Sequence, residues 1–251
     1  MVDMTSGRIA PQILRFAMPV LLGLVFQRIY NFADSYIVGH FLGDNALAAV
    51  SVAGVGMYLV FSLIIGLTTG VTVVMSQYYG AKEEDKVVKT FFSSIFIALG
   101  MTILVTVIGL LMTRPLLIVL QTPAEVLDAA VLYLRIICAG SVGTMLYNWI
   151  SAVLRSLGNS VVPLIFLGIS SLLNIVFDIL FVAVIPMGVG GAAFATVLAQ
   201  IISGVACLLY AWKILPMLRI RRDKLKLDTY IGKQMLVYGL PAALQMSIIS
   251  I

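Results

Sequence analysis

The chain has 251 residues, of which 61% are hydrophobic and 11% are charged, and its mean hydropathy is +1.11. Soluble domains carry roughly 25% charged residues, so this composition excludes an ordinary soluble protein and indicates an integral membrane protein. The net charge of +5 comes mostly from the loops on one side of the predicted membrane spans, and it does not indicate a nucleic-acid partner.

Uncharged stretches longer than about 18 residues predict membrane-spanning helices. Six spans and the start of a seventh are expected, at 13–38, 46–77, 91–113, 131–153, 161–185, 190–212 and from 234 to the end. The second stretch has 37 uncharged residues between Asp44 and Lys82 and no polar turn within it, which favours one long tilted helix. The predicted fold class is therefore all-α, a six-helix transmembrane bundle with the start of a seventh helix.

Positive charge is distributed unevenly among the predicted loops. With the N-terminus inside, the inner loops hold 13 of the 16 Lys and Arg residues, whereas only Arg114 and Arg135 fall outside and Arg28 falls within the first span. The positive-inside rule therefore predicts a multi-pass plasma-membrane protein with a cytoplasmic N-terminus. The basic run RIRRDKLK at 219–226 also suits contact with anionic membrane lipid.

A weak internal repeat relates the two ends of the chain. PQILRFAMPVLL at 11–22 and KQMLVYGLPAAL at 233–244 share Gln, Leu, an aromatic residue, Pro and Leu at the same places, with an offset of 222 residues. This predicts that the seventh span restarts a six-span unit, as in transporters built from two parallel halves. We expect a six-helix lobe at 1–215, a basic cytoplasmic linker at 216–233 and the truncated start of a second lobe at 234–251.

Polar residues recur at helical spacing in three of the predicted spans. Residues at i, i+3 or i+4, and i+7 lie on one face of a helix. The first, fifth and sixth spans each carry such a stripe: Gln27, Asn31 and Asp34; Ser171, Asn174 and Asp178; and Thr196, Gln200 and Ser203. At ~1.5 Å per residue, Asp34, Asp178 and Thr196 all lie on the order of 10 Å below the outer surface. Their oxygens are therefore expected to meet.

A carboxylate within the hydrocarbon core costs roughly 2.5–3.5 kcal/mol, so two carboxylates at one depth need compensation or a function. Two carboxylates, a hydroxyl and nearby amides form an oxygen set that suits H⁺ or Na⁺. In one alternative the stripes only join helices through hydrogen bonds. In another, Arg28 bridges to Asp178 between helices.

Sequence motifs of covalent catalysis are not found. The chain contains no H-E-x-x-H, G-x-S-x-G or P-loop pattern, so we expect neither an enzyme nor a cofactor apart from a coupling ion. GVGGAA at Gly188 matches a dinucleotide-binding pattern, but it falls in the turn between two predicted spans. Gly66 and Gly70 have the spacing of a helix-packing motif.

Five segments, taken together and in order, are specific enough to compare with a known family. They are FAMPVLLGLVFQRIYNFADSYIVGHFLGDNALAAV, GLTTGVTVVMSQYYGAKEEDK, SAVLRSLGNS, NIVFDILFV and GVGGAAFATVLAQ. They resemble the bacterial branch of the multidrug and toxic compound extrusion (MATE) family, over essentially the whole chain. The resemblance implies two six-helix lobes, of which this chain would be the N-terminal one. It also implies alternating access, with export of organic, often cationic, drug-like compounds against inward H⁺ or Na⁺.

The resemblance extends to individual residues. The cation site of the family's N-terminal lobe matches Asp34, Asn174, Asp178 and Thr196, and a proline implicated in bending helix one matches Pro19, which we expect to act as a hinge. Where some members carry an asparagine one turn before the arginine that matches Arg155, this chain has Ser151, with Asn148 a turn further back. The polar residues expected to line the cavity are Gln27, Asn31, Asn148, Ser151, Ser171 and Gln200.

Two rival functions stay open at this point. A flippase for a lipid-linked precursor, from the same broad fold group, would be expected to hold several arginines in its cavity, whereas the spans offer only Arg28. A non-transporting scaffold or channel subunit would not need two aspartates at one depth, so replacing them would be harmless. The sequence fixes neither the substrate nor the choice between Na⁺ and H⁺.

Overall fold

The computed structural model describes residues 9–215 and 226–249, and every regular element in these two ranges is a helix. The first three helices are α1 (Ile9–Leu42), α2 (Asp44–Gly80) and α3 (Glu84–Val119). They are followed by α4 (Ala124–Ala139), α5 (Ser141–Ser156) and α6 (Val161–Asp178), which continues into the π-helical turn η1 (Ile179–Val184). The last two helices are α7 (Gly188–Ile214) and α8 (Thr229–Ile249).

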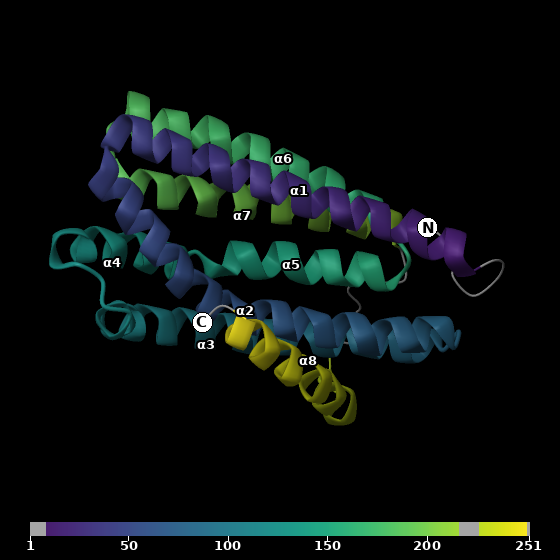
Figure 1. The fold of residues 1–251 in the computed structure, drawn as a ribbon. Helices are drawn as coiled ribbons and strands as arrows, with labels where there is room; N and C mark the ends of the chain where they lie inside the picture. Colours follow the sequence, from purple (N-terminus) through teal and green to yellow (C-terminus); the bar gives the residue numbers. More distant parts are fainter. Residues whose placement is uncertain (1–8, 216–225, 250–251) are drawn as a thin grey trace.

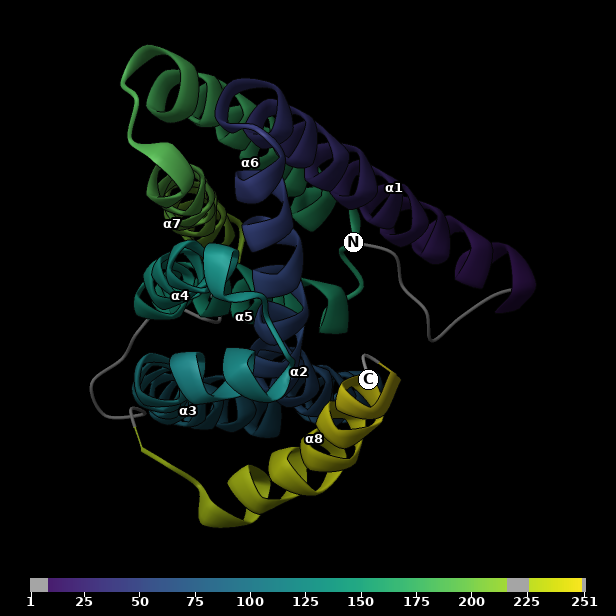
Figure 2. The ribbon, with the colours of Figure 1, turned by 60° about the vertical axis from the view of Figure 1, so that its left-hand side comes forward.

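The long helices run back and forth along one axis and form a bundle (Figure 1). Within the described residues, five helices are long and apolar enough to cross a membrane, and α4 and α5 together make a sixth span across a bend. The all-α membrane bundle predicted from the sequence is therefore confirmed. In the turned view, α1 and α6 lie side by side at one edge, and α2 crosses the middle of the bundle toward α3 and α8 (Figure 2).

The second and fourth spans test the sequence prediction most directly. The long uncharged stretch forms the single helix α2 over 37 residues, as predicted. The fourth span was predicted as one helix over 131–153, and this is wrong in two ways: it begins at Ala124, and it breaks at Gly140 with a bend of 49°. The early start arises because the charged turns before residue 131 are helical too, and there Asp128 pairs with Arg114 of α3 at 3.0 Å.

The break at Gly140 has a packing cause. A Cβ atom on this residue would lie 2.3 Å from the methyl groups of Val197, so glycine allows α7 to approach the bend closely. Thr106 of α3 donates a hydrogen bond to the Cys138 carbonyl at 3.3 Å, and its hydroxyl bonds that of Ser141 at 2.7 Å. These contacts satisfy polar groups that an interrupted helix exposes.

The helix of the predicted seventh span, α8, also begins earlier than predicted. α8 starts at Thr229 rather than at 234, because Asp228 caps it: its Oδ1 accepts hydrogen bonds from the backbone N–H groups of Tyr230 at 3.1 Å and Ile231 at 3.2 Å. Residues 216–225 of the expected linker, with most of its basic run, lie outside the described residues. The division of the chain into lobe, linker and second-lobe start stays a prediction.

α8 packs closely against α2. A Cβ on Gly66 would lie 2.4 Å from the Cβ of Ala243, and one on Gly70 would lie 2.1 Å from the Met235 carbonyl oxygen. The interpretation of this glycine pair as a helix-packing motif is confirmed, and the residues that it contacts belong to α8.

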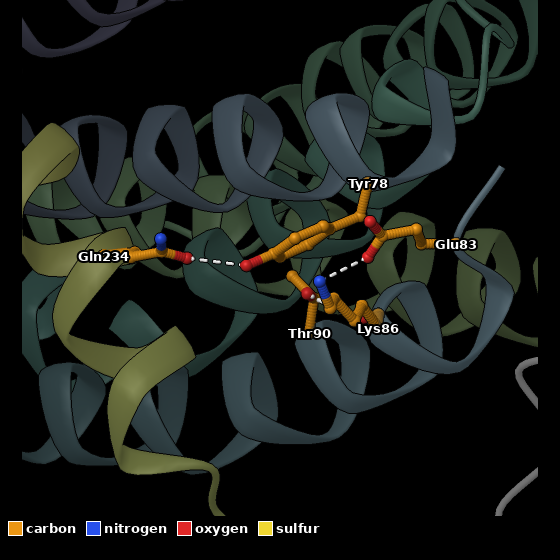
Figure 3. Close-up of polar contacts among 5 residues, drawn as sticks. All are labelled: Tyr78, Glu83, Lys86, Thr90 and Gln234. Atoms are coloured by element: carbon orange, nitrogen blue, oxygen red, sulfur yellow. Dashed lines mark hydrogen bonds and ion pairs between the residues drawn. The ribbon is translucent and has the colours of Figure 1, made fainter. Parts of the chain in front are cut away.

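Polar contacts hold the same helix near the turn between α2 and α3 (Figure 3). The Tyr78 hydroxyl donates to Gln234 Oε1 at 2.9 Å, and Lys86 pairs with Glu83 at 2.5 Å while its ammonium lies 5.2 Å from the centre of the Tyr78 ring. Gln234, the second residue in the C-terminal copy of the predicted repeat, therefore ties α8 to α2.

Candidate cation site

Two buried carboxyl groups meet where α1 packs against α6 and η1. Asp34 of α1 is 8% exposed and Asp178, the last residue of α6, is 0% exposed. The two carboxyl groups lie close enough to each other to interact electrostatically. Ionised carboxylates accept hydrogen bonds but cannot donate them, so this pair needs a proton or another cation between its members. The sequence-based prediction that these two acids share one depth agrees with this arrangement.

Asn174 and Thr196 extend the site on α6 and α7. The Asn174 Nδ2 donates a hydrogen bond to the Thr196 Oγ1 at 3.2 Å. Two tyrosines complete the surroundings: Tyr133 of α4 lies beside Thr196, and Tyr133 and Tyr30 are both close enough to the acids to interact with them electrostatically. Four helices, α1, α4, α6 and α7, thus contribute to one polar cluster.

Four oxygens of this cluster have no hydrogen-bond donor. Asp34 Oδ1, both carboxylate oxygens of Asp178 and Asn174 Oδ1 are buried and lack a hydrogen-bond partner among the described residues. Buried acceptors are almost always paired in proteins, because desolvation without a partner is costly. A bound cation satisfies several acceptors at once, and the residues present therefore fit H⁺ or Na⁺. Arg28 is exposed and leaves Asp178 unpaired, so the alternative bridge between them is not formed.

The donor set is limited to two carboxylates and neutral oxygens. Within residues 9–215 and 226–249, no group of three or more His, Cys, Asp or Glu side chains gathers to hold a metal ion. A cavity of about 310 Å³ lies between α3, α5 and α7 and is lined almost wholly by apolar side chains. Trp149, in its wall, donates its Nε1 hydrogen bond to Ser94 at 2.8 Å, so this cavity offers no set of oxygens for a cation.

The remaining predicted residues fall into two groups. On α5 and α7, Thr144 bonds the side-chain oxygen of Gln200, and Asn148 donates to the Thr144 carbonyl at 2.8 Å. Ser151 is buried on the same face of α5, whereas Ser171 donates back to the carbonyl of Leu167 in its own helix at 2.9 Å. These residues lie toward the end of the bundle that holds the N-terminus of α1 (Figure 1), rather than around the acid pair.

Gln27 and Asn31 are exposed, although the helical spacing puts them in a stripe with Asp34. The reason is that α1 lies at the edge of the bundle and becomes well buried only toward its C-terminal end. Pro19 lies within α1, which the structure shows as one continuous helix. Proline removes one backbone hydrogen bond there, and its role as a hinge stays a prediction.

Sequence reasoning missed three residues in and next to the site, and one backbone feature. Tyr30 precedes Asp34 by four residues, so helical spacing gave a usable signal for it. Tyr133 and Thr144 sit in the span whose break was not foreseen, and nothing in their local pattern marks them. The widened turn η1 begins directly after Asp178. Such π-helical turns are frequent at functional sites, but they have no sequence signature that periodicity detects.

Comparison with known proteins agrees with the fold. The MatE family model matches residues 19–180, a segment that contains Asp34, Asn174 and Asp178. The probable multidrug resistance protein YpnP of Bacillus subtilis is 35% identical over 99% of this chain and 55% of its own length. The probable multidrug resistance protein NorM of Thermotoga maritima is 26% identical over 94% of this chain and 52% of its own. The chain spans about half the length of the curated relatives it matches.

Solved structures give the same result. A crystal structure described as MATE in the bent conformation has a TM-score of 0.87 and 26% identity, over 96% of this chain and 54% of that one. A MOP superfamily transporter from Pyrococcus furiosus has a TM-score of 0.88 and 25% identity, over 97% and 54%. Since the family model covers more than half of the residues and a relative exceeds 30% identity, the chain belongs to the MATE family of membrane transporters.

Proposed function

We propose that this chain forms the N-terminal lobe of a two-lobed multidrug exporter in the plasma membrane. The family membership, the half-length match and the names of the relatives support this proposal. The described basic residues near the helix ends support a cytoplasmic N-terminus, because Lys82, Lys86, Arg155, Lys213 and Lys226 belong to the turns at one end of the bundle. A second lobe would face this one and complete a central cavity.

In this proposal, H⁺ or Na⁺ binds between Asp34 and Asp178 and drives the export of organic, often cationic, compounds by alternating access. The observation that carries it is the set of four buried oxygens without donors on Asp34, Asn174 and Asp178. Without a cation, two carboxylates repel each other strongly in a medium of low dielectric constant. A cation between them removes this repulsion, so its binding favours close packing of α1 against α6 and α7.

Antiport follows if the drug prefers the other packing. Cation and drug then weaken each other's binding, and at equilibrium the factor is the same in both directions. The exposed polar residues of α1, Gln27 and Asn31, are placed to line the cavity on the side that a second lobe would close. Movement of α1 would then couple the buried acids to the drug.

The test is drug efflux from proteoliposomes that contain the two-lobed protein, with an imposed pH or Na⁺ gradient. Asp178→Asn keeps the size of the side chain and removes its ability to bind a cation by charge, so efflux should no longer respond to the gradient. Asp128→Asn is the matched control, because its side chain is 83% exposed and pairs with Arg114 rather than with either acid of the site. Gradient-dependent efflux in Asp178→Asn equal to wild type would place the coupling site elsewhere. A non-transporting scaffold would show no drug efflux in any of the three proteins.

A further inference from the structure

Two matched polar stripes run from the acid pair toward the other end of the lobe. On α5 and on α7, polar side chains and one thiol follow the spacing i, i+4, i+7, i+11, which keeps them on one helix face. The stripes are Thr144, Asn148, Ser151 and Arg155 on α5, and Thr196, Gln200, Ser203 and Cys207 on α7. The two helices run in the same direction (Figure 1), so the stripes descend together.

Close contacts between α5 and α7 bring these stripes against each other. A Cβ on Gly143 would lie 2.6 Å from Ile201, and one on Gly204 would lie 3.2 Å from the backbone nitrogen of Tyr147. The hydrogen bond from Asn174 to Thr196 at 3.2 Å joins the acid cluster to the α7 stripe. One helical turn further along α7, Thr144 of the α5 stripe bonds the side chain of Gln200. We call the line of contact between the α5 and α7 stripes the seam. The polar cluster at the acids is therefore continuous with this seam.

Two hydroxyl groups in this seam have no partner. Ser203 is 0% exposed and Ser151 is 1% exposed, and the Oγ of each lacks a hydrogen bond among the described residues. Hydroxyls in apolar helices often bond a carbonyl of the preceding turn, and many described hydroxyls elsewhere in this chain do so. Examples are Ser51, Thr90, Thr102 and Ser171. The seam differs because its hydroxyls do not take this internal acceptor.

The inner end of the seam is also polar. Tyr147 donates its hydroxyl hydrogen bond to the Pro163 carbonyl at 2.9 Å and lies beside Ser151 and Arg155. Arg155 is largely buried in the last turn of α5 and forms no ion pair among the described residues. A guanidinium group presents five N–H donors, so this end of the seam needs acceptors as well as donors. Water supplies both, and buried water typically occupies sites where several polar groups lack partners.

We infer that a file of ordered water follows the seam between α5 and α7, from the acid pair past Ser203 and Ser151 to Arg155. Through this file a proton held at Asp34 and Asp178 exchanges with the cytoplasm while the lobe stays closed toward the drug cavity. The direction of this exchange rests on the proposed function and orientation. The presence of water in the seam rests only on the unpartnered hydroxyls and the continuity of the stripes.

Hydrogen–deuterium exchange of single thiols tests the file in the 251-residue chain reconstituted in lipid vesicles. In a background with Cys138→Ala and Cys207→Ala, Ser151→Cys or Ser203→Cys places one thiol in the seam. The matched controls are Ala152→Cys, next to Ser151 in sequence, and Ala199→Cys, four residues before Ser203, and both alanines are as buried as the two serines. After transfer to D₂O, the infrared S–H band of the seam thiols should decay at least tenfold faster than that of the controls. Equal decay rates at seam and control positions would overturn the inference.

Blocking variants establish the side from which water enters. Ser151→Val lies between the cytoplasmic end and position 203, so it should slow the exchange of a thiol at 203 about tenfold. Ser203→Val should leave the thiol at 151 fast. The reverse pattern would mean that water enters from the outer side and would overturn the proposed route. None of these exchange measurements requires transport. Slow exchange at the seam positions would therefore contradict the water file alone, whereas gradient-dependent efflux in Asp178→Asn would contradict the proposed function alone.

Discussion

The amide of Asn174 donates a hydrogen bond to the hydroxyl of Thr196 over 3.2 Å and thereby ties α6 to α7 beside the two acids. This bond fixes the amide so that its Oδ1 is left as a buried acceptor without a donor. One hydroxyl on α7 therefore orients a cation ligand on α6. The cation site is in this sense a product of helix packing as well as of the two carboxylates.

Replacing that hydroxyl should weaken cation binding. Thr196→Val keeps the shape and removes the acceptor, so the Asn174 amide loses its orientation. Loss of a buried hydrogen bond of this kind costs about 1–3 kcal/mol, and the apparent affinity for the coupling cation should fall on the order of tenfold. Thr196→Ser keeps the hydroxyl and should stay near wild type. The dependence of drug efflux on Na⁺ concentration and on pH measures this, and equal dependence in all three proteins would contradict it.

The contact between α2 and α8 should be sensitive to a single methyl group. A Cβ on Gly70 would lie 2.1 Å from the backbone oxygen of Met235, so Gly70→Ala must push the helices apart, at a cost of about 1–3 kcal/mol. Gly54→Ala in the same helix has open space and is the control. Thermal unfolding in detergent should show a lower midpoint for Gly70→Ala only. Similar midpoints for the two variants would mean that the close contact does not stabilise the bundle.

Much of this fold follows from hydropathy and charge, because apolar length decides where a helix can cross a membrane. Asp34, Asn174, Asp178 and Thr196 could be grouped from helical spacing and depth, since both depend only on position along a helix. The break at Gly140 could not be predicted, because its cause is the approach of Val197, which is distant in sequence. Contacts between helices decide which stripe members are buried.

Tyr133 and the widened turn η1 show the same limit. Tyr133 reaches the site only because the bent span places α4 beside α7, and a tyrosine within an apolar segment gives no warning of this. From the sequence, some polar residues of α5 and α7 could be identified, but only within each helix taken separately. Their union into one seam required the register between the two helices, which sequence periodicity does not provide.

Pro19 is expected to act during transport rather than during folding. It lies inside α1, where the missing N–H weakens the helix locally and permits a bend. Pro19→Ala should insert and express normally but lower the rate of drug efflux severalfold. Pro115→Ala is the control, because Pro115 also lies inside a long helix, α3, and this variant should transport like wild type. Wild-type efflux in Pro19→Ala would reduce this proline to a feature of helix geometry.

The proposed orientation can be measured with one pair of cysteines. Glu84 begins α3 in the basic turn, and Glu125 lies in the first turn of α4 at the opposite end of the bundle. In a background without Cys138 and Cys207, a thiol in place of Glu125 should react with an impermeant reagent added to intact cells. A thiol in place of Glu84 should react only after the cells are permeabilised. Labelling in the opposite order would reverse the topology.

The most direct measurement of the central claim is cation binding to this chain itself. In lipid vesicles, infrared spectra recorded across a pH titration report protonated carboxyl groups, and added Na⁺ competes with a proton that it replaces. We predict one signal from a buried protonated carboxyl group that either titrates with pH or is lost when Na⁺ is added. This signal should disappear in both Asp34→Asn and Asp178→Asn, and it should persist in Asp128→Asn. A signal that persists unchanged in Asp34→Asn and Asp178→Asn would contradict a cation shared between these two residues.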